Sequence, residues 1–380
     1  MSPPRLPPEL VQLISNNVED RTTFFTLRLV SQTLNSLAIP RAFAVLSVQD
    51  TPEHGNALCA LQNCEERITS SVRKVIFEGE STSWHFQRDR PEEERSREAV
   101  TGAFSGLTKF PNLEELILNF DDTWWEGKYT MEEPDEPSHY LYLQLGILEA
   151  LAQNPHPALV SLSLHNLIAI PNDVFSKLHF PGLKTLSLSA ITNVNLSRMF
   201  TSGTLGFFWQ TTIPQIIQSA GESLTSLTIA SDLNIGAVSG PAMDFGFEED
   251  DGLFLPHLAH LALENFVFEP SGETGDPALW IVRHKPTLRR LELRNCTIDG
   301  GEEMYYERRW DAVFKLFEEE LEQLREFVFS NPSDEGVPFV YTYVDPSWGY
   351  ASVDDPEDRN EEDDGIALRS LLAVVEARNE

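Results

Sequence analysis

The chain has 380 residues, of which 41% are hydrophobic, so it is long enough for a small module plus one extended domain with a buried core. Its formal net charge is -32 at pH 7, and all the excess acid lies beyond Asp50, because residues 1–50 hold four acidic and four basic side chains. A surface this negative repels phosphate groups. This excludes nucleic acid and membrane surfaces as expected partners and favours basic protein segments.

The sequence gives no sign of export or membrane insertion. Residues 1–8 lack the apolar core of a signal peptide, and no later run approaches the apolar length of a membrane-spanning helix. The three cysteines, Cys59, Cys64 and Cys296, cannot all pair, and such sparse usage suits a reducing compartment. We therefore expect a cytoplasmic or nuclear protein.

The first forty residues predict short helices. Apolar residues recur at helical spacing at Leu6, Leu10, Leu13 and Ile14. Thr22 or Thr23 is expected to cap a second helix that runs to Val30. Ser31 is expected to begin a third helix, which Pro40 should end.

A spaced apolar pattern, Leu-x-x-Leu-x-Leu, recurs along the rest of the chain. Clear copies begin at Leu113, Leu159, Leu183, Leu224, Leu258, Leu288 and Leu324, and Val72/Val75/Phe77 forms a degenerate earlier copy. Helical patterns lie between copies, as over residues 141–151 and 310–324. One copy gains roughly 5 to 9 kcal/mol from burying its apolar side chains, whereas ordering it costs on the order of 30 to 60 kcal/mol. The copies must therefore stack, which predicts an α/β fold of the irregular leucine-rich-repeat type, a parallel-sheet solenoid with helices on its outer face.

Two features qualify this prediction. Asparagine follows many of the predicted strands, at Asn119, Asn166, Asn265, Asn295 and Asn331, one position earlier than in regular leucine-rich repeats, so the turn geometry is left open. Leucine-rich strands alternating with helices also describe a doubly wound α/β enzyme. Such an enzyme usually carries a Gly-rich phosphate turn or a nucleophile elbow after a strand, and the sequence contains neither.

Three runs near the N-terminus form a pattern together: Leu6-Pro7-Pro8-Glu9-Leu10, Leu27-Arg28-Leu29-Val30-Ser31 and Leu37-Ala38-Ile39-Pro40-Arg41. This pattern resembles the F-box, and with the repeats it is similar to fungal F-box proteins that carry leucine-rich repeats. The resemblance implies that the helices dock on the Skp adaptor of a cullin-RING (SCF-type) ubiquitin ligase. It also implies that the repeats select the protein to be ubiquitinated.

Carried over by position, the resemblance implies an adaptor-binding apolar surface. Its residues are Leu6, Pro7, Leu10, Ile14, Leu27, Val30 and Leu34. Where many F-boxes have Cys and Trp after the valine, this chain has Ser31 and Leu34, which puts the strength of the anchor in question. A helical unit this small cannot bury all its apolar side chains, so a partner is expected to cover the rest. The alternative is that these helices only cap the first strand of the repeats.

Long insertions follow several strands, over residues 119–140, 190–213, 230–253 and 331–364, and should cluster along one rim. The rim is aromatic and acidic, which suits capture of a basic protein segment. Its candidate partner-binding residues are Trp124, Trp125, Tyr129, Phe207, Phe208, Trp209, Phe245, Phe247, Glu249 and Asp250. The alternative is that the rings fold back onto the repeat core.

The sequence shows no signature of catalysis or of a cofactor. Cys59 and Cys64 lack a second close pair or a nearby histidine, so no metal site is expected. No phosphate loop, dinucleotide fingerprint or zinc-binding helix occurs. We therefore expect a non-enzymatic binding protein. The competing hypotheses are a repeat scaffold outside any ligase and a hydrolase or transferase with buried catalytic residues.

We expect three segments along the chain. These are a helical docking module over residues 1–45, a repeat domain over 46–330, and an acidic tail with a terminal capping helix over 331–380. Within the last segment, residues 354–364 are expected to be a solvated run. Leu368, Leu371, Leu372 and Val375 then predict the terminal helix.

Overall fold

The computed structural model describes residues 18, 20–79, 90–121, 139–191, 202–232, 234–236, 243, 245, 253–268, 276–299, 309–330, 342–344 and 361–379. The chain forms two compact units, residues 1–163 and 164–380, and each is described by itself. The expected division into three segments stays a prediction. No helix in the described residues is long and apolar enough to cross a membrane.

The first unit begins with two short helices, α2 (Arg21–Leu27) and α3 (Gln32–Ala42). The cap of α2 is Asp20, whose carboxylate accepts hydrogen bonds from the Thr22 and Thr23 backbone N–H groups, so the prediction of a threonine cap was wrong. Ser31 caps α3 as predicted, through a bond from Leu34 N. The helix continues two residues past Pro40, contrary to prediction, and a further helical bond follows the proline, from Phe43 N to Ile39 O at 3.1 Å.

Three parallel strands of the first unit follow the repeat pattern: β1 (Val45–Gln49), β2 (Lys74–Glu78) and β3 (Glu115–Asn119). Leu46 pairs in register with Val75, which pairs with Leu116, and the next apolar row is Val48, Phe77 and Leu118. These side chains are buried, and the residues between them are half-buried or exposed. β1 is thus a copy that the sequence analysis missed.

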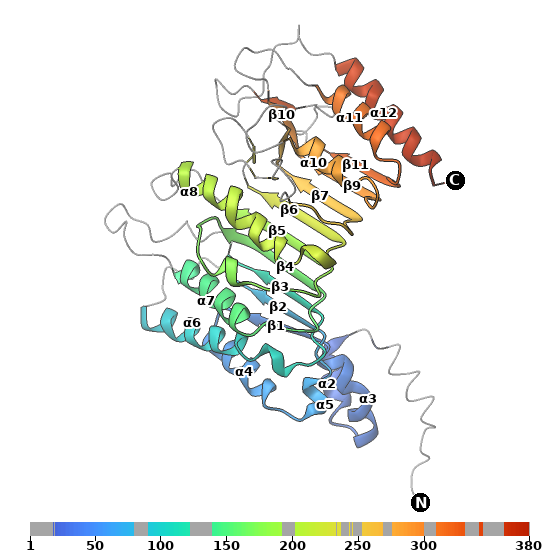
Figure 1. The fold of residues 1–380 in the computed structure, drawn as a ribbon. Helices are drawn as coiled ribbons and strands as arrows, with labels where there is room; N and C mark the ends of the chain where they lie inside the picture. Colours follow the sequence, from blue (N-terminus) through green and yellow to red (C-terminus); the bar gives the residue numbers. More distant parts are fainter. Residues whose placement is uncertain are drawn as a thin grey trace, which may run out of the picture. The chain divides into compact units, whose positions relative to one another are not determined.

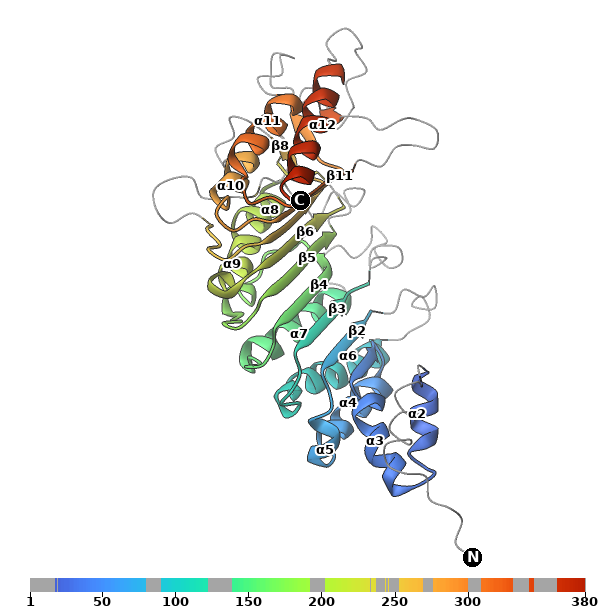
Figure 2. The same ribbon diagram turned by 90° about the vertical axis from the view of Figure 1, so that its right-hand side faces the viewer.

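Helices pack along one face of these strands (Figures 1 and 2). They are α4 (Pro52–Gln62), α6 (Arg90–Phe104) and α7 (His139–Gln153), and the short α5 (Glu66–Thr69) follows α4. α6 packs against both α4 and α7. The contact with α4 is close at Gly55, where an added Cβ would lie 2.6 Å from the carbonyl carbon of Ala99.

The second unit repeats the same design with β5 (Thr185–Ile191), β6 (Ser226–Ser231), β7 (His260–Glu264), β9 (Arg290–Arg294) and β11 (Glu326–Ser330). All of these pair in parallel, and the apolar residues stay in register throughout. One row contains Leu186, Leu227, Leu261, Leu291 and Phe327; the other contains Leu188, Ile229, Leu263, Leu293 and Phe329. β4 (Ser161–Ile168) contains the boundary of the two units. The strand order β1-β2-β3-β4-β5-β6-β7-β9-β11 confirms the predicted parallel α/β architecture.

Asparagine adopts a left-handed conformation at one position within β4 and at the positions directly after β7 and β9. Asn166, Asn265 and Asn295 have φ angles of 60°, 62° and 48°, a left-handed conformation that asparagine tolerates better than most residues. The side chain of Asn295 donates to Asn265 Oδ1, and that of Asn265 donates to the Ser231 carbonyl, so the turns are tied to one another. The chain then enters a second small parallel sheet of β8 (Val267–Phe268), β10 (Thr297–Asp299) and β12 (Thr342–Val344). Asn119 instead ends β3, and Asn331 lies outside the described residues.

Several helical segments of the second unit bury aromatic side chains. They are α8 (Ser202–Phe207), the π-helical turn Phe208–Thr212, α9 (Ile213–Gln218), α10 (Pro277–Arg283) and α11 (Trp310–Glu320). Trp280 and Trp310 are fully buried, and the Trp310 ring stacks on Phe314 at 5.4 Å between centroids. The region from Ser202 to Thr212 was expected to be an insertion but is helical.

The terminal helix α12 (Glu361–Ala377) packs against α11 and β11, which confirms the predicted helix. Leu371 and Val375 face the core, whereas Leu372 is exposed. Asp364 was assigned to a solvated run and is instead buried in α12, where its Oδ1 accepts a 2.8 Å bond from Asp311 N. This bond satisfies one of the open N–H groups at the start of α11.

Candidate functional site

The turn between α2 and α3 exposes large apolar side chains. Leu29 is 88% exposed and Val30 is 65% exposed, and Phe25 on α2 is 38% exposed. The turn is nonetheless hydrogen-bonded, with Leu29 N donating to Thr26 O at 3.0 Å and Val30 N donating to Leu27 O at 3.1 Å. We call Phe25, Leu29 and Val30 the apolar tip.

The predicted adaptor-binding residues divide into three groups. Val30 belongs to the apolar tip, and Leu27 and Leu34 are half-buried in α2 and α3. The others, Leu6, Pro7, Leu10 and Ile14, lie outside the described residues. Leu29, which stands in the Leu-Arg-Leu-Val-Ser run, was not predicted as an adaptor-binding residue, yet it is the most exposed residue of the apolar tip.

Arg28 links the apolar tip to the first repeat. Its guanidinium carbon lies 4.6 Å from the ring centroid of Phe43 and 5.8 Å from that of Phe25. The two rings contact each other edge to face at 5.6 Å, and Arg28 Nε donates to Asn35 Oδ1 at 3.3 Å. Cation–π contacts of this kind favour one placement of the side chain. Arg28 therefore contacts α2 through Phe25, α3 through Asn35, and Phe43, which directly follows α3.

The predicted aromatic rim is wrong at three positions. Phe208 and Trp209 are fully buried and pack edge to face at 5.7 Å, because the π-helical turn points both rings into the core. Phe245 is also buried and lies 4.8 Å from the Trp280 ring. Phe207 is 52% exposed, as a rim residue must be. The remaining rim residues, Trp124, Trp125, Tyr129, Phe247, Glu249 and Asp250, lie outside the described residues.

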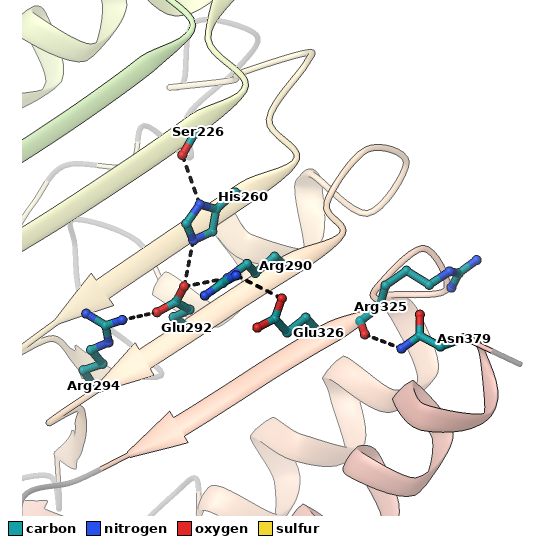
Figure 3. Close-up of polar contacts among 8 residues, drawn as sticks. All are labelled: Ser226, His260, Arg290, Glu292, Arg294, Arg325, Glu326 and Asn379. Carbon is teal, nitrogen blue, oxygen red and sulfur yellow. Dashed lines mark hydrogen bonds and ion pairs between the residues drawn. The ribbon is translucent and has the colours of Figure 1, made fainter. Parts of the chain in front are cut away.

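A polar cluster crosses the face of the second unit's sheet that carries the outward side chains of β6, β7, β9 and β11 (Figure 3). His260 Nε2 donates to Glu292 Oε1 at 3.0 Å, and the Ser226 hydroxyl bonds His260 Nδ1 at 3.0 Å. Arg290 Nε donates to the same carboxylate at 2.6 Å, and Arg294 Nη2 donates to its other oxygen. The sequence analysis missed this cluster. The alternating Arg-x-Glu-x-Arg of β9 was the available signal.

The Glu292 carboxylate organises this cluster. Burial acts to raise its pKa, but the hydrogen bond from Arg290, the charge of Arg294 and the bond from His260 outweigh burial and hold the pKa below its usual value. Arg290 Nη1 also pairs with Glu326 Oε2 at 3.0 Å. The arginine charges are thus compensated by carboxylates. The arrangement fixes His260 and ties four strands together, and the backbone N–H of Ser226 donates to Lys184 O at 3.0 Å.

A second buried polar group lies at the end of β1 in the first unit. Asp50 is fully buried and accepts a 2.6 Å bond from the Ser96 hydroxyl of α6 and a 2.9 Å bond from His139 Nε2 of α7. These bonds hold the helices to the strand end. Within the described ranges, no group of His, Cys, Asp and Glu side chains is arranged to hold a metal ion.

Comparisons with known proteins identify no family. No protein-family description and no curated protein matches the chain. Among solved structures, the leucine-rich repeat-containing protein LegL7 from Legionella pneumophila is similar at 12% identity, covering 86% of this chain and 98% of that one with a TM-score of 0.30. D-psicose 3-epimerase with D-tagatose from Clostridium cellulolyticum H10 is similar at 9% identity, covering 95% of each chain with a TM-score of 0.20. Likenesses this distant carry no argument about the chain.

Proposed function

We propose that this chain is a non-catalytic protein-interaction adaptor, and specifically the substrate-recognition subunit of an SCF-type ubiquitin ligase. In this proposal the N-terminal helices dock on a Skp-family adaptor, and through it on a cullin. The repeats bind the target protein. The proposed compartment is the cytoplasm or nucleus, and a basic segment of the target is the partner that the net charge of -32 favours.

The observation that carries the proposal is the exposure of Leu29 and Val30, at 88% and 65%. Most of the surface of these two adjacent apolar side chains is left uncovered by the fold itself. Covering them with another protein would remove apolar area from water, which favours association by roughly 25 cal/mol for each Å² buried. The Leu-Arg-Leu-Val-Ser run that resembles the F-box is the segment that presents them.

Charge substitution at the apolar tip tests the docking step. Leu29→Asp should weaken binding of a purified Skp-family adaptor by about a hundredfold or more, because a carboxylate buried in an apolar contact loses its hydration. The measurement is calorimetric titration of the full chain with the adaptor. Leu372→Asp, at an exposed leucine of α12, is the matched control and should bind as the unmodified chain does. Full binding by Leu29→Asp would refute the docking step.

A second experiment separates the ligase from the alternative, a repeat scaffold that works outside any ligase. The apolar tip supports docking on a partner, but docking alone does not require ubiquitin transfer. Reconstitution with adaptor, cullin and a bound target should give ubiquitinated target that is lost with Leu29→Asp. Adaptor binding with no cullin recruitment, or no adaptor binding at all, would favour the scaffold.

A further inference from the structure

The segment that presents the apolar tip has a charge unlike the rest of the chain. Residues 21–49 contain three arginines, Arg21, Arg28 and Arg41, and no aspartate or glutamate, in a chain with a formal net charge of -32. We propose that the apolar tip and Arg28 together dock into an apolar pocket bordered by carboxylates on the partner protein. This inference rests on the docking role proposed above and names the chemistry of the surface that receives the tip.

Arg28 is placed to meet a carboxylate at the border of the tip. It directly precedes Leu29 and Val30, and its side chain is held against the rings of Phe43 and Phe25. Among the described residues, only its Nε has a hydrogen-bond acceptor, Asn35 Oδ1. A guanidinium carries five N–H donors in a planar fork that matches the two oxygens of a carboxylate. The Nη groups therefore remain as donors for a partner's acid.

The tip is already in a fixed shape before any partner arrives. Arg28 N, Leu29 N and Val30 N each donate to a carbonyl of α2, at 3.1, 3.0 and 3.1 Å, and Ser31 Oγ caps α3 by accepting from Leu34 N. Docking therefore costs little backbone ordering, which improves affinity for a partner of matching shape. An Arg28 that is stacked and hydrogen-bonded also loses less side-chain freedom than an unrestrained arginine.

The local charges favour an acidic border over a basic one. Arg41 lies in the last turn of α3, at the end of that helix away from the tip, with its guanidinium carbon 5.2 Å from the Phe24 ring centroid, so Arg28 is the described charge that borders the tip. The nearest described acid in sequence is Asp20, at the opposite end of α2 from the tip, and its carboxylate is bonded by Thr22 and Thr23. A basic partner surface would be repelled here and attracted by the acidic remainder of the chain.

Paired peptides test this border chemistry directly. The probes are two fluorescein-labelled helical peptides with the same leucine face, flanked by glutamates in one and by lysines in the other. Binding to the full chain is measured by anisotropy at about 0.15 M salt, where charges beyond roughly 8 Å are screened. Binding that is present in the unmodified chain and absent in Leu29→Ser is assigned to the tip. Binding of the lysine peptide to acidic surfaces elsewhere is the same in both chains and is therefore subtracted.

The expected result is tip-dependent binding about tenfold tighter for the glutamate peptide than for the lysine peptide. Arg28→Met should abolish that preference, whereas Arg67→Met, at an exposed arginine of α5, should leave it intact. A lysine preference, or a glutamate preference that survives Arg28→Met, would overturn the inference. Self-association in sedimentation that Leu29→Ser abolishes would also overturn it, since a second copy would then occupy the tip.

The two proposals fail in different ways. A chain that prefers the glutamate peptide but does not bind a Skp-family adaptor refutes the ligase function and supports the border chemistry. A chain whose adaptor binding is unchanged by Arg28→Met, and which shows no peptide preference, refutes the border chemistry alone.

Discussion

His284 is a buried histidine whose neutral form the fold requires. Its Nε2 accepts a 3.1 Å bond from Leu255 N, and its Nδ1 donates to Trp280 O at 2.9 Å. Burial lowers the pKa of His284 from 6.5 to about 4, opposed by the bond to Trp280 O and aided by the charge of Arg283. A proton on Nε2 would face the Leu255 N–H, so protonation breaks a bond in the core.

This histidine should make stability depend on pH. Because the folded-state pKa lies below the unfolded value, the contribution is fully present above pH 6.5 and is lost as the pH falls toward about 4. The full loss is roughly 3 kcal/mol, from about 1.4 kcal/mol for each pKa unit. Urea unfolding at pH steps across this window measures it.

His284→Gln provides the comparison, since an amide keeps polar atoms near Trp280 O and Leu255 N without titrating. Subtracting its unfolding free energies from those of the unmodified chain removes the contributions of other groups, including His156, whose pKa burial also lowers. The difference should shrink as the pH falls from 6.5 to about 4. A constant difference across that window would contradict the assignment.

Single residues show where sequence reasoning succeeds and where it stops. Asparagines near the strand ends were identified from the sequence, and Asn265 and Asn295 do follow β7 and β9 directly, whereas Asn166 lies within β4. All three adopt the left-handed conformation, which asparagine tolerates better than most residues. Phe208 and Trp209 were misplaced because an aromatic ring suits a core and an interface equally well. Their burial depends on tertiary packing, in which Phe208 contacts Phe175 of another segment, and the sequence pattern does not show that contact.

At the scale of elements, α12 is the structure that closes the end of the repeats. Arg378 Nη1 donates to Leu321 O at 2.7 Å, and its Nη2 donates to Glu318 O at 3.0 Å. Asn379 Nδ2 donates to Arg325 O at 2.7 Å (Figure 3). Leu371 of α12 is fully buried. α12 therefore covers apolar surface and open backbone carbonyls where the described strands end in sequence.

Leu371→Ala should lower the free energy of unfolding by about 2 to 5 kcal/mol, the usual cost of emptying a buried leucine site. Leu372→Ala, on the 40% exposed neighbour, should cost less than about 1 kcal/mol and serves as the control. Denaturant unfolding of both variants measures the difference. Equal effects would mean that α12 does not seal the core.

The elements also show which sequence patterns predict structure. The helix α12 was predictable from Leu368, Leu371 and Val375, since a terminal helix with one apolar face has one place to pack. The strand β1 was missed because its copy reads Phe43, Leu46 and Val48, with leucine at only one of the three positions. Any large apolar residue can be buried at these positions, so a pattern defined by leucine alone does not identify every copy.

At the scale of the whole molecule, the net charge of -32 opposes the compact state through self-repulsion. Salt should therefore stabilise this protein, since raising the ionic strength from about 0.01 M to about 0.15 M shortens the screening length from roughly 30 Å to 8 Å. The midpoint of thermal unfolding at pH 7 should rise between these conditions, with NaCl and KCl giving the same shift. A midpoint that falls with salt would show that attractive ion pairs outweigh the repulsion.

The architecture was predictable at this scale because it follows from repetition: a pattern that returns many times and cannot fold alone must stack. The surface chemistry was less predictable. The Glu292 cluster depends on side chains of four strands meeting on one face, and a single strand shows only alternating charge. The exposure of Leu29 likewise depends on what the fold leaves uncovered.

The constant register of the parallel ladder has a consequence for how such a protein can change over evolutionary time. The copies that contain β5, β6, β7, β9 and β11 begin as few as 30 and as many as 41 residues apart, yet their apolar rows remain aligned residue for residue. Lengthening or shortening a connection therefore leaves the strand partners as they were. Mutations can therefore change the sequence and length of the connections while the strand pairing is kept, and new binding specificities can arise on an unchanged sheet.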